Sequence, residues 1–206
     1  MDIVIESVKK LELLLEHSGC EDGGVLLEVN PDAANCRYEK GACMSATFGG
    51  RSADFTTFDP IRAHTKISFM FGAPLDTPPV RSAACAIVNV ATGFFCLSRV
   101  LHTCSPTSHG HCHEMLVQEL AGKSVWCVGD VPGIDRECPV VPAMAPSEAD
   151  VLIIGGEGII APATGDLIET WQKTKRIICI GPSTAGTARL HDLEHWCPFG
   201  RSNATT

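Results

Sequence analysis

The residues best suited to chemistry gather in the stretch "SHGHCHE", residues 108–114. It holds three of the eight histidines, His109, His111 and His113, together with Cys112. Imidazole and thiolate suit zinc, nickel, copper or iron, and His109 and His113 have the i, i+4 spacing of a helical chelating pair. A divalent transition metal is therefore one expected cofactor. The alternative is a serine-capped helix whose first turn is simply polar and exposed.

A second set of polar residues follows three short apolar runs, "SVWCVGD", "ADVLIIGGEG" and "RIICIGPST". Short buried strands that alternate with helices indicate a parallel α/β sheet, and ligands gather beyond the carboxyl ends of such strands. We therefore predict parallel strands over residues 124–129, 151–155 and 177–181, with their ends converging on a ligand cleft. The expected cleft residues are Asp130, Gly155, Gly156, Glu157, Gly181, Pro182, Ser183 and Thr184.

The familiar nucleotide signatures are absent from these turns. "GGEGIIAP" is not G-x-G-x-x-G, and "GPSTAGTA" lacks the lysine of a phosphate-binding loop. The sequence therefore gives no support to NAD or ATP as a cofactor. Glycines that only form tight strand-to-helix turns are the alternative interpretation.

The stretch "PVRSAACAIVNVATGFFCLSRVL" is apolar on nearly every side, and Thr77-Pro78-Pro79 at its start favours a helix. Such a helix is covered all round by protein. Asn89 lies in its middle, so its amide needs partners, which could be backbone groups or a ligand. We expect Asn89 to lie close to the strand ends, and we expect the main pocket to lie between two domains, walled by Glu157 and Ser183.

The pattern of the chain changes near residues 121–123. Before that point, helical spacing over residues 3–16 is followed by a β-rich region over residues 24–58. The sequence thus predicts an α/β protein with a small α+β domain over residues 1–121, followed by a Rossmann-like parallel-sheet domain over residues 122–206. The last residues, 201–206, are expected to form a frayed tail.

The three apolar runs and the alanine-rich helix resemble the heavy-metal chelation family, a domain family of unknown function. The resemblance rests on "VWCVGD", "EADVLIIGGEGIIAPATGDLIE", "RIICIGPST" and "PVRSAACAIVNVATG", and covers residues 79–199 well and the start more loosely. It implies an enolase-N-terminal-like first domain, a Rossmann-like second domain and a site between them. This chain departs from the family at Glu157, where a hydroxyl is usual, and at Ala185, where proline is usual.

Composition excludes several classes of partner. The net charge of −8 repels nucleic acid, and the acidic N-terminal region does not fit a secretory signal. Residues 83–101 contain Asn89, Thr92 and Arg99, which makes them a poor membrane span. An odd number of cysteines, eleven, without a secretory signal argues against a disulfide framework, and the absence of a C-x-x-C pair gives no support to a zinc ribbon or a thioredoxin motif. We expect a cytoplasmic protein with no nucleic-acid or membrane partner, and a homo-oligomer is left open.

Two further groups of residues are expected to be structural. His191 and His195 are spaced i, i+4 with Cys197 nearby and could bind a metal if helical, but a surface helix explains them with less effort. Asp54 and Asp59 flank "FTTF" and are expected to form a turn. No Ser-His-Asp triad can be assigned from sequence, because triads are recognised by geometry.

The leading expectation is a protein that binds a transition metal, a metal complex or a small anionic metabolite in the interdomain cleft. One alternative is a metal-independent enzyme that acts on a small metabolite, with Glu157 as acid or base. The other is a non-catalytic scaffold.

Overall fold

The structure, a computed structural model, describes residues 1–134 and 140–203. Its strands are β1 (Gly24–Asn30), β2 (Ala42–Phe48), β3 (Arg51–Thr57), β4 (Ala63–Lys66), β5 (Ser124–Val128), β6 (Val141–Pro142), β7 (Val151–Ile154), β8 (Arg176–Ile180) and β9 (Glu194–Trp196). Its α-helices are α1 (Ile3–Leu15), α2 (Pro78–Phe94), α3 (His109–Glu119), α4 (Gly156–Ile160), α5 (Thr164–Trp171) and α6 (Ala185–Leu190). Short 3-10 turns complete the elements, η1 (Ile67–Met70), η2 (Pro106–Ser108), η3 (Pro146–Glu148) and η4 (Pro182–Thr184).

The first sheet is antiparallel, with the strand order β3-β2-β1-β4. Side chains alternate across a strand, and in β3 the buried Ala53 and Phe55 join the core that α2 shares. Ser52 and Asp54 therefore point to the opposite face of the sheet, away from α2. This second face carries the polar groups discussed below.

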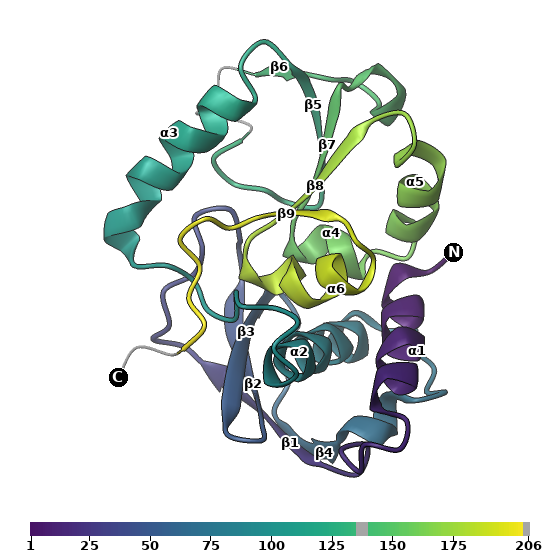
Figure 1. Ribbon diagram of the computed structural model, residues 1–206. Coiled ribbons are helices and arrows are strands. Elements are labelled where there is room, and N and C mark those ends of the chain that lie inside the picture. Colours follow the sequence, from purple (N-terminus) through teal and green to yellow (C-terminus); the bar gives the residue numbers. More distant parts are fainter. Residues whose placement is uncertain (135–139, 204–206) are drawn as a thin grey trace.

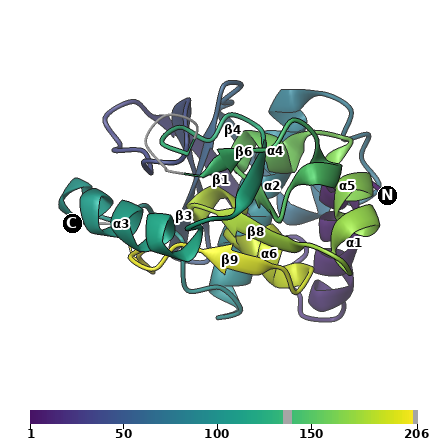
Figure 2. The same cartoon turned by 90° about the horizontal axis from the view of Figure 1, so that it is seen from above.

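The second sheet is parallel throughout, with the order β6-β5-β7-β8-β9. The predicted parallel pairing of β5, β7 and β8 is confirmed, and the chain has the predicted α/β fold. Counted along the chain, the order is 2-1-3-4-5, a doubly wound arrangement whose switch point lies between its first and third strands, here β5 and β7. α3 and α5 lie on opposite sides of this sheet (Figures 1 and 2).

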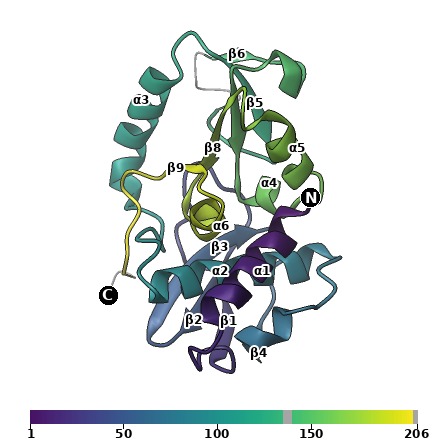
Figure 3. The same ribbon diagram turned by 45° about the vertical axis from the view of Figure 1, so that its right-hand side comes forward.

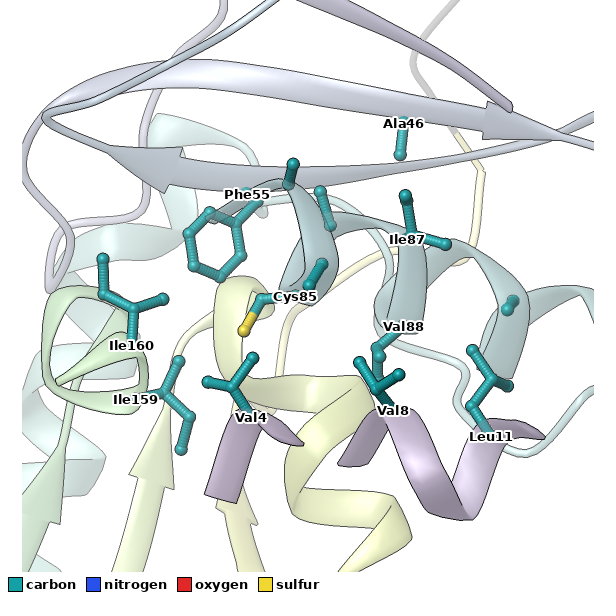
Figure 4. Packing of buried hydrophobic residues seen from close by; sticks show 14 of the residues in the cluster. Val4, Val8, Leu11, Ala46, Phe55, Cys85, Ile87, Val88, Ile159 and Ile160 are labelled. Carbon is teal, nitrogen blue, oxygen red and sulfur yellow. The ribbon is translucent and has the colours of Figure 1, made fainter. Parts of the chain in front are cut away.

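The carboxyl ends of the parallel strands point toward the antiparallel sheet, and α1, α2, α4 and α6 lie between the two sheets (Figure 1). One hydrophobic cluster runs through this layer. Figure 4 shows Val4 of α1 near Cys85 of α2 and near Ile159 of α4, and Val8 of α1 near Val88 of α2. The apolar core is thus continuous between the two sheets. The division into two domains at residues 121 and 122 stays a prediction.

A buried ion pair fixes α1 against α2. Asp2 caps α1 by accepting from the backbone N–H groups of Val4 and Ile5. The same carboxylate receives both terminal nitrogens of Arg81, at 2.7 and 3.0 Å, and Arg81 is only 3% exposed. Burial disfavours the charged carboxylate, but the hydrogen bonds from Arg81 outweigh it and lower the pKa of Asp2. Arg81 also donates to the backbone carbonyls of Leu75 and Ile160, so the pair joins the start of α1 to α2 and α4.

α2 ends at Phe94, earlier than the apolar pattern up to Leu101 predicts. Cys96 takes a left-handed conformation with a φ of 58°, which ends the helix. The N–H groups of Leu97 and Ser98 then turn back to the carbonyl of Thr92, at 2.8 and 3.2 Å. The chain after α2 is therefore a compact loop that leads into residue 101.

The predicted frayed tail is wrong at Arg201. Its N–H donates to the carbonyl of His102 and its carbonyl accepts from the N–H of His102, both at 2.9 Å. The C-terminal segment also runs beside the start of α3 (Figure 3), where the rings of Phe199 and His111 lie 5.4 Å apart. Residues 204–206 lie outside the described part of the chain.

Candidate functional site

Asn89 and the predicted strand ends meet, as expected, between the two sheets. The Nδ2 of Asn89 donates to the carbonyls of Ser183 and Pro182 at 3.0 and 3.3 Å. Its Oδ1 accepts from the backbone N–H of Gly186 at 2.8 Å. Asn89 is 1% exposed, so the partners that its amide required are backbone groups. This residue joins α2 to the turn before α6.

The "GPST" turn is filled by protein groups as well. The N–H of Ser183 donates to Glu39 Oε1 at 2.9 Å, and Ser183 Oγ accepts from the N–H of Thr56 at 2.8 Å. Gly181 has a φ of 83°, and a Cβ there would lie 2.4 Å from Glu39 Oε1. Thr184 Oγ1 donates within its own turn, to the carbonyl of Gly181 at 3.1 Å. The absence of a side chain at Gly181 therefore leaves the space that the carboxylate of Glu39 occupies.

We call the polar contacts between the two sheets, made by Glu39, Asn89, Glu157 and Ser183, the seam. Glu39 is the residue of the seam that the sequence did not predict. Its side chain lies between the sheets, and within the described residues its Oε2 has no hydrogen-bond partner. Burial raises the pKa of the Glu39 carboxyl to about 7, against the opposing effect of the hydrogen bonds from Ser183. The carboxyl is therefore close to its ionisation midpoint at neutral pH.

The two acidic residues predicted for the cleft bind groups of the first half of the chain. Glu157 Oε1 accepts from the backbone N–H of Phe58 at 3.0 Å. Asp130 forms an exposed ion pair with Lys40, with 3.1 Å between Oδ2 and Nζ. Both carboxylates thus bridge the sheets from the rim of the seam.

The glycines at the switch point serve close backbone packing. A Cβ on Gly129 would lie 2.3 Å from the nitrogen of Gly158, and one on Gly158 would lie 2.0 Å from the carbonyl oxygen of Val128. A Cβ on Gly156 would lie 3.0 Å from Ser183 Cβ, and one on Gly155 would contact Val131 at the same distance. α4 therefore packs directly onto the end of β5, as the alternative interpretation of these glycines predicts.

The prediction that Glu157 and Ser183 wall the main pocket is wrong. A pocket of about 510 Å³ lies instead on the face of the antiparallel sheet that points away from α2, and neither residue lines it. The closed seam explains the difference, because Asn89, Glu157 and Ser183 are hydrogen-bonded there to groups of the protein. Residues that line the pocket and carry polar groups include Ser45, Ser52, Asp54, His102, Thr103 and Arg201.

Three of these residues form a hydrogen-bonded chain in the pocket wall. His102 Nδ1 lies 2.9 Å from Asp54 Oδ2, and His102 Nε2 lies 3.4 Å from Ser52 Oγ. Because a carboxylate only accepts, we assign the ring proton to Nδ1, which leaves Nε2 free to accept from the hydroxyl of Ser52. This is the order of groups in a Ser-His-Asp triad.

Local structure holds this chain from several sides. Ser52 and Asp54 are two residues apart in β3 and share one face, and Ser45 stands opposite Asp54 in the sheet register. The hydroxyl of Ser45 donates to Asp54 Oδ1 at 2.8 Å, which fixes the second carboxylate oxygen. The backbone pairing of His102 with Arg201 positions the imidazole. His102 is 4% exposed, so the ring has little freedom to move.

The expectation that Asp54 and Asp59 form a turn is wrong for Asp54, which lies within β3. Asp59 does lie beyond the strand, in a bend. The alternation of "RSADFTT" could have placed Ser52 and Asp54 on one face of a strand. No local signal could have brought His102 to them.

The histidine cluster occupies the first turns of α3. His113 Nδ1 lies 3.4 Å from the hydroxyl of Tyr38, whereas the side chain of His111 is 66% exposed and that of Cys112 is buried. Burial and the charge of Arg37 lower the pKa of His109. Across residues 1–134 and 140–203, no three His, Cys, Asp or Glu side chains are placed to hold a metal ion. A metal here stays a prediction.

The second histidine pair does not share a helix, so that prediction is wrong. α6 ends at Leu190, and His195 lies in β9, a strand that the sequence did not reveal. His191 Nε2 lies 3.1 Å from Ser7 Oγ, and His195 Nε2 lies 2.8 Å from the carbonyl of Gly181.

Comparisons of the chain with family models, with curated proteins and with solved structures found no match. The resemblance to the heavy-metal chelation family therefore stays a prediction. No helix in the described parts of the chain is long and apolar enough to cross a membrane.

Proposed function

We propose that this protein is an acyl-transfer enzyme, most simply a hydrolase, that acts on a small ester or thioester in the pocket of about 510 Å³. The observation that carries the proposal is the chain from Asp54 through His102 to Ser52, which lines that pocket. A volume in the range of about 300 to 1,000 Å³ suits a small molecule. A cytoplasmic location is part of the same proposal.

Ser52, His102 and Asp54 have distinct roles in the proposed reaction. His102 Nε2 takes the proton of the Ser52 hydroxyl as Ser52 Oγ attacks the carbonyl carbon of the substrate. The imidazolium then gives that proton to the departing alcohol or thiol. In the second half, His102 takes a proton from water, the resulting hydroxide displaces Ser52 from the acyl group, and the proton returns to Ser52. Asp54 holds the ring in the required tautomer and stabilises the imidazolium.

This proposal belongs to the enzyme class considered from sequence, but it moves the acid and base from Glu157 to His102. Glu157 accepts a backbone hydrogen bond at the seam, away from the pocket lining. His102 has a nitrogen directed at a hydroxyl that lines the pocket. The spacing of 3.4 Å is longer than an ideal hydrogen bond, and catalytic contacts without substrate are often long.

Labelling with a fluorophosphonate, followed by peptide mass mapping, tests the nucleophile. We expect covalent modification of Ser52, and we expect hydrolysis of short-chain p-nitrophenyl esters or thioesters by the unmodified protein. Ser52→Ala should abolish labelling at that position. His102→Gln should lower the labelling rate by a factor of roughly 100 or more, because general-base catalysis contributes about that much.

Ser68→Ala is the matched control, since Ser68 is another half-buried serine and its hydroxyl bonds to Asp22 instead. It should leave both labelling and hydrolysis unchanged. A folded protein that is labelled elsewhere but not at Ser52, or a His102→Gln variant that reacts at the wild-type rate, would contradict the proposal.

A further inference from the structure

A smaller cavity of about 200 Å³ lies between the loop that follows α2 and the last helix, α6. Its lining includes Ser98 and Arg99 from the loop, Arg189 from the last turn of α6, and Leu193 and His195 beyond that helix. Two arginines thus reach one cavity from segments that are far apart in the sequence.

The charge of this cavity is unbalanced. Arg81 and Arg176 each lie against carboxylates. In contrast, Arg99 and Arg189 form no ion pair or hydrogen bond within the described residues, and no carboxylate is among the residues that line the cavity. The whole protein carries a net charge of −8. Two guanidinium groups without a paired carboxylate therefore create a positive electrostatic potential at this place on a negatively charged protein. Such a place attracts anions.

The wall formed by His195 is hydrogen-bonded to the turn after β8 and adds no charge. His195 Nε2 lies 2.8 Å from the carbonyl of Gly181, and because a carbonyl only accepts, this nitrogen carries the ring proton. Burial lowers the pKa of the imidazole, so the ring is neutral at neutral pH. The opposite wall is held by the backbone hydrogen bonds from Leu97 and Ser98 to Thr92. The positive charge of the cavity therefore comes from its two arginines.

We propose that this cavity binds a phosphate group through Arg99 and Arg189. Guanidinium groups present paired N–H donors that match the oxygens of phosphate. Two positive charges balance a phosphate dianion, whereas a single carboxylate would leave one of them uncompensated. The volume of about 200 Å³ is below that of pockets for whole drug-sized ligands. It suits inorganic phosphate, or the phosphate end of a larger metabolite whose remainder stays in solvent.

Isothermal titration with inorganic phosphate, at an ionic strength kept constant with chloride, tests this site. We expect saturable binding of one phosphate to the wild-type protein. Arg99→Gln and Arg189→Gln should each weaken it about tenfold, or about 1.4 kcal/mol, because each removes charge-assisted hydrogen bonds to the phosphate. Arg62→Gln is the control, since Arg62 is an exposed arginine outside this cavity, and it should bind as the wild type does.

The same titration with phenyl phosphate separates the two sources of the group. Tighter binding of phenyl phosphate assigns the site to an organic phosphate, and equal or weaker binding assigns it to the inorganic ion. Circular dichroism establishes that each variant is folded, and Arg99→Lys, which keeps the charge but not the paired donors, should bind with intermediate affinity. Absence of saturable binding to the wild type, or undiminished binding by the folded double Gln variant, would overturn the proposal.

Discussion

Replacement of Glu39 by glutamine should change how the stability of the protein depends on pH. The carboxyl of Glu39 is buried between the sheets, and burial raises its pKa from 4.5 to about 7. Glutamine keeps an oxygen that can accept from the N–H of Ser183, as Glu39 Oε1 does at 2.9 Å, but it cannot ionise. The variant therefore removes the ionisation and retains the hydrogen bond.

The direction and size of the effect follow from the two pKa values. Below pH 4.5, Glu39 is protonated in both the folded and the unfolded protein, and ionisation has no effect on stability. Between that pH and about 7, the unfolded chain loses its proton while the folded protein holds it, so stability falls as the pH rises. At about 1.4 kcal/mol for each pH unit, the total loss is roughly 3 kcal/mol. The Glu39→Gln variant should not show this loss.

Urea unfolding at a series of pH values from 4 to 8, followed by tryptophan fluorescence, measures the difference between the two proteins. Other groups cancel in that difference. One of them is His191, whose pKa burial lowers to about 4 and which therefore destabilises both proteins as the pH falls. Glu12→Gln, at an exposed position on α1, should follow the wild-type curve. Parallel curves for the wild type and Glu39→Gln would refute the reasoning.

Three further changes test the packing between and around the helices that separate the two sheets, each by the free energy of unfolding in urea. Arg81→Ala leaves the carboxylate of Asp2 unpaired in a half-buried site and should cost about 3 to 5 kcal/mol. Asn89→Ala leaves the N–H of Gly186 and two carbonyls without their partner, and should cost about 2 to 4 kcal/mol. Gly158→Ala forces a Cβ against a carbonyl oxygen and should cost more than about 2 kcal/mol. A loss below about 0.5 kcal/mol, typical of surface changes, would contradict the corresponding contact.

Local patterns were sufficient to predict much of the fold. β7 is buried at all four positions, as a continuous apolar run in a parallel sheet should be. The prolines in the first turn of α2 placed its start correctly, and the apolar character of that helix correctly predicted a buried Asn89. These features depend on residues that are close together in the sequence, so they can be predicted from local patterns.

The features that were missed depend on contacts between distant segments or on very short elements. Glu39 lies in "CRYEKG", where a charged residue is ordinarily exposed, and only its contact with Ser183 makes its burial intelligible. β9 has three residues, too few for any periodicity to appear. The contact of His102 with Asp54 joins positions 48 residues apart. Nothing near either residue signals the other.

The arrangement of polar groups explains why the outer pocket, and not the seam, is the place to seek chemistry. At the seam, the hydrogen bonds of three side chains are already made to backbone groups from the other half of the protein. These side chains are Asn89, Glu157 and Ser183. A ligand could replace those bonds only if the layer of helices between the sheets moved apart, which would expose the continuous apolar cluster to water. The pocket above β3 needs no such opening, because Ser52 and Asp54 point away from the core and line a space that already exists. Polar groups thus hold the two sheets together, and the Asp54, His102 and Ser52 side chains of the proposed catalytic site lie on the surface that this packing leaves free.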